Sequence, residues 1–347
     1  MKGLIRPGER SDEVADIQRR LRALKLEVDD ETGYFGESTK RALREFQQQR
    51  GIIVDGIVGQ HTWNELVEAS WRLGDRALYL RVPMIRGDDV LTLQSRLNAL
   101  GYDAGREDGI FGRSTDSGVH AFQREYGVPE DGIFGPASHA ALMGLRVDRP
   151  GTASRLREEL RRGEGGLSDA LVFIDPGHGG GDRGEVGPDG LVEAEVCWDL
   201  ARRLAGRLAA GGAKVRFSRT EIESPDASER ARRANQKDAD LFISLHLNAH
   251  DSGAGEGSTT FYFGGSRAGE ALADRLQAEL VKLDLKDCRS HARSYPVLRE
   301  TRMPAVLVEP AFITHPDDEK KMRDSEFLGR AADAITTGVM RYYKEGF

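Results

Sequence analysis

The stretch Ala170-Leu171-Val172-Phe173-Ile174-Asp175-Pro176-Gly177-His178-Gly179-Gly180 decides the fold of the C-terminal half of this chain. Residues 170–174 are all apolar and include Val and Ile, which is typical of a short buried strand. The strand stops at the Pro-Gly pair, and glycines surround the histidine that follows. A helix is expected next, at about residues 193–210, closed by Gly211-Gly212. Strand, glycine-rich loop and helix in this order predict the first unit of an α/β domain.

The same alternation continues to the end of the chain. Strands are expected at about residues 214–218, 240–246, 259–263 and 305–309, and helices at about 225–237, 268–283, 317–324 and 327–343. This pattern predicts a mostly parallel sheet flanked by helices on both faces. Such sheets bind ligands at the carboxyl ends of their strands, where His178, His246 and Glu309 fall. We therefore expect these side chains to converge on one site.

The side chains near these strand ends are typical metal ligands. The candidates are His178, Glu193, His246, His250 and Glu309. Catalytic zinc usually takes three protein ligands and leaves one position for water, so two histidines and one carboxylate are sufficient. His250 lies four residues beyond His246 across a strand end, and we expect it to be a surface histidine. The glycine-rich loop lacks the Gly-Lys-Ser/Thr ending of a phosphate-binding loop, which argues against a nucleotide site.

The N-terminal half contains an internal repeat at an offset of 76 residues. Residues 33–39, Gly-Tyr-Phe-Gly-Glu-Ser-Thr, return at 109–115 as Gly-Ile-Phe-Gly-Arg-Ser-Thr. Apolar residues at helical spacing and glycines between them predict three short helices in each copy. The expected architecture is thus two small all-α three-helix repeats, at residues 1–70 and 80–146, followed by an α/β catalytic domain at 169–347. Residues 147–168 are expected to be a linker with a short charged helix at 156–162.

Composition narrows the class of protein further. The chain of 347 residues is 39% hydrophobic and 31% charged with a net charge of −7, which suits a globular protein and argues against a nucleic-acid binder.

The apolar run near the start is only Leu4-Ile5, too short for a secretory signal, and no segment is apolar enough to span a membrane. From this we expect a cytoplasmic location. The cell wall or the extracellular space is the alternative if the natural start lies upstream.

The repeats resemble the peptidoglycan-binding domain found at the ends of many cell-wall hydrolases. The resemblance rests on Leu-Gln-x-x-Leu, Gly-x-Phe-Gly-x-Ser-Thr, Phe-Gln and Asp-Gly-x-x-Gly, and it covers about residues 6–67 and 85–145. It implies binding of glycan or stem peptide. Packing, or contact with a protein partner, is the alternative role that the helical pattern leaves open.

The C-terminal domain resembles the zinc-dependent N-acetylmuramoyl-L-alanine amidases over about residues 170–345. The matching segments are 175–180, Glu193, Arg230 with Ala234-Asn235, 239–248 and 304–309. The resemblance implies that His178, Glu193 and His246 bind zinc, that Glu309 is the catalytic carboxylate and that Asn248 helps to position substrate. The sequence departs from the family at Asp182-Arg183-Gly184-Glu185 and at Glu309-Pro310-Ala311-Phe312, where Asp-Pro-Gly-Ala and Glu-Leu-Gly-Phe are usual.

Two functions follow from these observations. In the first, the protein hydrolyses the amide between the lactyl group of muramic acid and L-alanine, in peptidoglycan or in muropeptides. A metal-bound water with a pKa of about 7 and a neighbouring carboxylate are the groups that such a reaction needs. In the second, the layout of two repeats and this domain resembles an actinobacterial amidase homologue that regulates peptidoglycan precursor synthesis. That alternative implies a cytoplasmic precursor-synthesis enzyme as partner and weak or no hydrolysis.

Overall fold

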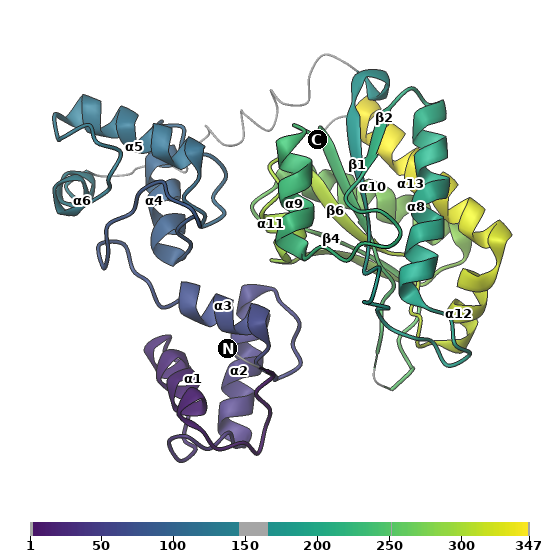
Figure 1. The fold of residues 1–347 in the computed structure, drawn as a ribbon, viewed down its shortest axis with the longest axis horizontal. Coiled ribbons are helices and arrows are strands. Elements are labelled where there is room, and N and C mark those ends of the chain that lie inside the picture. The colour runs from purple at the N-terminus through teal and green to yellow at the C-terminus, as the bar shows by residue number, and fades with distance from the viewer. Residues whose placement is uncertain (1–2, 146–165, 251, 346–347) are drawn as a thin grey trace. The chain divides into compact units, whose positions relative to one another are not determined.

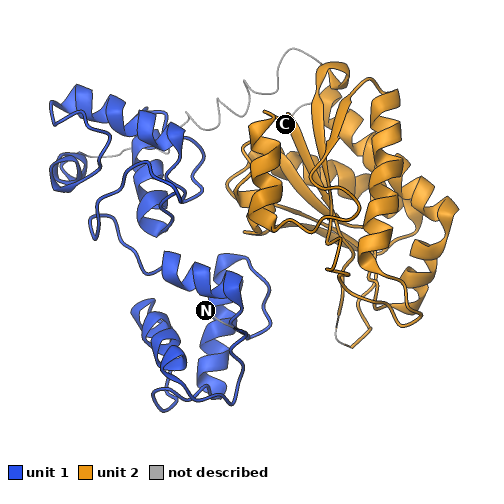
Figure 2. Cartoon of the chain, viewed as in Figure 1, with its two compact units in different colours: residues 1–157 blue, residues 158–347 orange. Residues whose placement is uncertain are grey.

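The computed structural model describes residues 3–145, 166–250 and 252–345. The chain divides into two compact units, residues 1–157 and 158–347, shown in blue and orange in Figure 2. Most of the expected linker, including its charged helix at 156–162, lies outside the described residues. The domain boundaries expected at residues 70, 80, 146 and 169 stay predictions.

Unit 1 is all-α, as expected, with three helices for each repeat (Figure 1). Their bounds are α1 Asp12–Ala23, α2 Glu37–Arg50, α3 Gln60–Glu68, α4 Asp88–Ala99, α5 Arg113–Tyr126 and α6 Pro136–Met143. Each repeat has a hydrophobic core of its own, built around Phe35 and Phe46 in the first and around Phe111 and Phe122 in the second.

Buried glutamines hold the glycine loops of both repeats. Gln47 donates a hydrogen bond from Nε2 to the carbonyl of Ile57 (3.1 Å) and accepts one at Oε1 from the amide of Gly56 (2.8 Å). Gly56 has a φ of +73°, which glycine adopts without strain. Three more glutamines each donate to a loop carbonyl and accept from a glycine amide in the same way: Gln18, Gln94 and Gln123. The repeated Gln and Gly positions therefore hold the loops between the helices in the same way in both repeats.

Unit 2 is built on a six-stranded sheet in the order β2-β1-β3-β6-β4-β5. The strands are β1 Leu171–Pro176, β2 Lys214–Phe217, β3 Leu241–Leu245, β4 Ser258–Tyr262, β5 Asp287–Ala292 and β6 Ala305–Glu309. All neighbouring strands are parallel except β4 and β6, which pair antiparallel. The expected mostly parallel sheet is confirmed, and the carboxyl ends of β1, β3 and β6 lie next to one another.

Helices cover both faces of this sheet (Figure 1). They are α8 Glu193–Ala210, α9 Ala227–Gln236, α10 Arg267–Leu280, α11 Pro296–Arg299, α12 Pro316–Arg323 and α13 Ser325–Glu345, with 3₁₀ turns at Leu167–Asp169 and Val281–Leu283. Alternate residues of each strand point to opposite faces. Val172 and Ile174 therefore pack against α8 and α13, whereas Phe173 joins the smaller core beneath α9 and α11.

Two elements of unit 2 were not expected from the sequence. Strand β5 has the polar sequence Asp-Cys-Arg-Ser-His-Ala and lies at the edge of the sheet, so it carries little apolar pattern. The one-turn helix α11 begins at Pro296 and is too short to show helical periodicity. Among the described helices, none is both long enough and apolar enough to cross a membrane.

Candidate metal centre

Three side chains from separate elements meet at the carboxyl edge of the sheet. His178 lies in the loop after β1, His246 directly follows β3, and Glu193 is the first residue of α8. One donor atom from each of the three lies within 4.8 Å of the others. The sequence predicted these residues as the metal ligands, and the fold brings them together.

The Glu193 carboxylate lies between the two imidazoles. Its Oε2 is 3.1 Å from Nε2 of His178, and its Oε1 is 3.0 Å from Nδ1 of His246. The amides of Glu185 and Leu247 each donate a hydrogen bond of 3.0 Å to it. Burial alone would raise the pKa of Glu193, but the bonds to both histidines outweigh burial and hold that pKa well below its usual value. The site therefore keeps a negative charge that attracts a cation.

Asp182 orients the ring of His178 from the side away from Glu193. Its Oδ2 lies 2.9 Å from Nδ1 of His178, so Nε2 is the nitrogen left to face Glu193. A carboxylate behind a histidine ligand is a common arrangement in metal sites because it selects the tautomer and orients the ring. In the sequence, Asp182 stands out only as part of an altered motif, and no role was predicted for it. Its spacing of four residues from His178 was the available signal.

The space between these side chains exists because two glycines have no Cβ. A Cβ on Gly177 would lie 2.5 Å from Cε1 of His246, and one on Gly184 would lie 2.7 Å from Oε2 of Glu193. Gly184 also has a φ of +66°, which other residues rarely adopt. Two imidazole nitrogens and a carboxylate oxygen around this space are the donor set of a catalytic zinc site. The residues present therefore fit a bound zinc ion.

Glu309 ends β6, the strand next to β3. Leu245 pairs with Val308 in the sheet, and the amide of His246 donates to the Val308 carbonyl at 3.0 Å. Glu309 is thus the residue beside His246 on the neighbouring strand end. Burial, and then the negative charge of Glu193, raise the pKa of Glu309 to about 8. The pKa values of the two carboxylates at this edge are thus shifted in opposite directions, so Glu193 stays ionised, as a metal ligand must be, whereas Glu309 can hold a proton near neutral pH.

The remaining candidates lie outside the three-ligand group. His250 is exposed, and its Nδ1 lies 2.8 Å from Oγ of Ser252, so it is a surface histidine as expected. The backbone of Asn248 joins the segments that follow β3 and β6. Its backbone amide donates to the carbonyl of Ala311, and its backbone carbonyl accepts from the amide of Ile313. Asn248 is thus bonded to a residue two positions after Glu309. The role of Asn248 in positioning substrate stays a prediction.

Comparison with known proteins agrees with this geometry. Residues 172–341 match the family described as "N-acetylmuramoyl-L-alanine amidase", and residues 10–66 and 86–142 each match the family described as "Putative peptidoglycan binding domain". A relative from Mycobacterium tuberculosis, "N-acetylmuramoyl-L-alanine amidase CwlM", is 42% identical over 365 residues, which cover 99% of this chain and 90% of that protein. The chain therefore belongs to the N-acetylmuramoyl-L-alanine amidase family.

Other relatives share the C-terminal unit. "N-acetylmuramoyl-L-alanine amidase LytC" of Bacillus subtilis is 39% identical over 176 residues, which are 50% of this chain and 35% of that protein. The crystal structure of an N-acetylmuramoyl-L-alanine amidase from Clostridium difficile 630 superposes with a TM-score of 0.50 at 32% identity, covering 52% of this chain and all of that one. These similarities do not favour the alternative in which the protein is a regulator of precursor synthesis.

Proposed function

We propose that this protein is a zinc-dependent amidase that hydrolyses the bond between the lactyl group of muramic acid and L-alanine. The observation that carries the proposal is the group formed by His178, Glu193 and His246 beside Glu309. When bound there, zinc would polarise the scissile carbonyl and lower the pKa of a water molecule.

The protein side chains would supply orientation and proton transfer. Asp182 holds the imidazole of His178 in place from the side away from the metal. Glu309 is the group suited to take up a proton at its carboxylate and to return it to the leaving amine nitrogen of L-alanine. A group of this kind works best when its pKa lies near the operating pH, and burial moves the Glu309 pKa in that direction.

The substrate class is peptidoglycan or soluble muropeptides. The two repeats support this proposal, since both match a peptidoglycan-binding family. A precursor-synthesis enzyme as partner and a cytoplasmic location both stay predictions from the sequence. Pull-down of such an enzyme with the full chain, and fractionation of cells that express it from its natural start, would test them.

The proposal is tested by zinc content and by muropeptide cleavage, measured together on the wild type and on Glu309→Gln. Free amino termini of L-alanine report cleavage of the expected bond. We expect zinc in both proteins and cleavage by the wild type alone, with a loss of about 100-fold or more in the variant because proton transfer is removed. Zinc in both with no cleavage by either would refute the hydrolase. Absence of zinc from both would refute the ligand assignment.

A further inference from the structure

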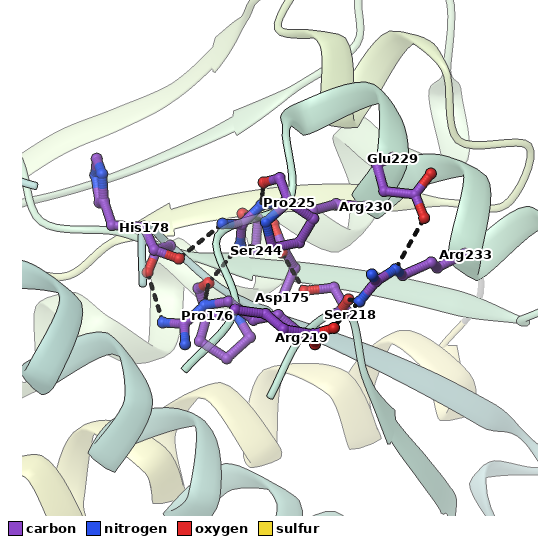
Figure 3. Close-up of polar contacts among 12 residues, drawn as sticks. Asp175, Pro176, His178, Ser218, Arg219, Pro225, Glu229, Arg230, Arg233 and Ser244 are labelled. Carbon is purple, nitrogen blue, oxygen red and sulfur yellow. Dashed lines mark hydrogen bonds and ion pairs between the residues drawn. The ribbon is translucent and has the colours of Figure 1, made fainter. Parts of the chain in front are cut away.

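We infer that two buried arginines, Arg230 and Arg219, are positioning residues that hold the backbone of the His178 loop in the shape needed to bind metal. This inference rests on the proposed function for the identity of the metal. It assigns to both arginines a role in metal affinity that goes beyond the folding of the domain. Figure 3 shows both arginines beside the loop that begins at Pro176.

Arg230 extends from α9 to the end of β1. Its Nη1 donates to the carbonyl of Pro176 at 2.7 Å, and its Nη2 donates to the carbonyl of His178 at 2.7 Å (Figure 3). Arg230 is 6% exposed, so water competes little for these bonds. A guanidinium presents its donors in a rigid fork, which fixes the separation of the two carbonyls that it binds.

Arg219 holds the same loop from the end of β2. Its Nε donates to the carbonyl of Pro176, and its Nη2 donates to the carbonyl of Gly177, each at 2.8 Å. It is 3% exposed. A Cβ on Gly179 would lie 2.5 Å from the Arg219 Cζ, so a glycine is needed where the guanidinium packs on the loop. Three consecutive carbonyls, from Pro176 to His178, are thus bound by two guanidinium groups.

The backbone of His178 shows what these bonds accomplish. His178 has a φ of +55°, in the left-handed region of backbone conformation that residues other than glycine seldom adopt. Such a conformation persists only where the surroundings impose it, and such residues often occur at functional sites. The bond from Arg230 to the His178 carbonyl fixes the peptide that follows. The side chain of His178 is thereby placed with its ring between Asp182 and Glu193.

The arginine that contacts His178 is itself anchored. Asp175, fully buried at the end of β1, accepts a hydrogen bond of 2.9 Å from Nη1 of Arg230. The hydroxyl of Ser244, from β3, donates to its other oxygen at 2.6 Å, and the hydroxyl of Ser218 also donates to Asp175. Strands β1 and β3 and the segment after β2 therefore meet at one carboxylate. Through Arg230, that carboxylate is linked to the backbone of a metal ligand.

The test compares full-length Arg230→Lys with the wild type. Lysine keeps the charge beside Asp175 but lacks the fork that bridges two carbonyls. Zinc affinity is measured by competition with a chelator, at a temperature where circular dichroism shows the metal-free variant to be folded. We expect affinity to fall about 10- to 100-fold, as for other residues that orient metal ligands. The matched control is Arg232→Lys on the same helix, which changes an exposed arginine paired with Glu229 and should leave affinity unchanged.

A second readout needs no metal. Proton and nitrogen NMR of the imidazole in the metal-free protein reports whether the Nδ1–H of His178 stays hydrogen-bonded to Asp182. We expect a slowly exchanging Nδ1–H signal in the wild type and an exchange-broadened signal in Arg230→Lys. If the wild type binds no zinc but this difference is seen, the proposed function is wrong and the positioning role stands.

The inference is overturned if a folded Arg230→Lys binds zinc as tightly as the wild type and shows the same imidazole signal. A general loss of stability would lower the melting temperature without changing either readout in the folded protein. If Arg230→Lys does not fold, Arg219→Lys takes its place, since Arg219 binds the carbonyls of Pro176 and Gly177 and makes no hydrogen bond to Asp175 among the contacts of the described residues. If Arg219→Lys binds zinc with wild-type affinity and shows the wild-type imidazole signal, the positioning role of Arg219 is refuted.

Discussion

The carboxylate of Asp182 lies 2.9 Å from Nδ1 of His178, on the opposite side of the ring from Glu193. The imidazole is thus held between two acidic groups, one exposed and one buried. Burial lowers the pKa of His178, but the bonds to Glu193 and Asp182 outweigh burial and raise that pKa above its usual value in the metal-free protein. A cation that binds at Nε2 must displace the proton held there, so metal binding should release protons.

Replacing Asp182 with alanine should weaken metal binding without unfolding the domain. The ring of His178 would lose the partner that selects its tautomer, and we expect zinc affinity to fall about 10- to 100-fold. Competition with a chelator measures this change. Asp199→Ala is the control, since Asp199 is a half-buried residue of α8 paired only with Arg203 among the ion pairs of the described residues. Equal zinc affinity in Asp182→Ala and the wild type would show that the contact has no role in the site.

Adding a methyl group to Gly184 should exclude the metal. Its Cβ would meet Cδ2 of His178 at 2.6 Å, and the positive φ of Gly184 adds backbone strain. We expect Gly184→Ala to lose most bound zinc, as measured by elemental analysis. Gly181→Ala in the same loop is the matched control, because nothing lies within 4 Å of the position of its Cβ. A full complement of zinc in Gly184→Ala would contradict the site geometry.

The raised pKa of Glu309 should make the metal-free protein less stable as the pH rises. Between the ordinary value of 4.5 and about 8, folded Glu309 holds a proton that the unfolded chain releases. The free energy of unfolding should therefore fall through this window, by at most about 1.4 kcal/mol per pH unit. Glu309→Gln removes that contribution.

The difference between the two proteins isolates Glu309, since their other titrating groups are the same. Chemical denaturation of both, at several values from about pH 5 to about pH 8, measures it. We expect the stability of Glu309→Gln relative to the wild type to increase with pH. A constant difference across the window would mean that Glu309 is ionised throughout.

Replacing a buried glutamine should destabilise unit 1 and leave the catalytic unit intact. Gln123→Ala would remove the acceptor of the Gly132 amide and the donor to the Ile133 carbonyl. Leaving the buried amide of Gly132 unpaired costs about 1–3 kcal/mol. Thermal unfolding should show a lower melting temperature for unit 1, with zinc content unchanged. The exposed Gln48→Ala on α2 should have no effect, and equal melting in the two variants would contradict the role of the glutamine.

The sequence alone predicted the strands and helices that form the core of unit 2. These segments are apolar with a clear period, because each buries one or both faces. Edge strand β5 was missed, since its burial is too slight to leave an apolar pattern. The order of the strands and the antiparallel pairing of β4 with β6 also could not be predicted, because both depend on contacts between segments far apart in the chain.

The candidate site divides in the same way. The convergence of His178, His246 and Glu309 could be predicted because these residues lie at strand ends, and parallel strands end at one edge of a sheet. Glu193 was a candidate because it begins the helix that follows the His178 loop. The roles of Asp182, Arg219 and Arg230 became clear only in the tertiary structure. Asp182 bonds to a neighbouring imidazole, and the two arginines bond to loop carbonyls. Such bonds depend on the three-dimensional course of the backbone, so they leave no periodic pattern in the sequence. The sequence by itself therefore determined which residues could bind a metal, and the tertiary structure alone decided which groups hold them in place.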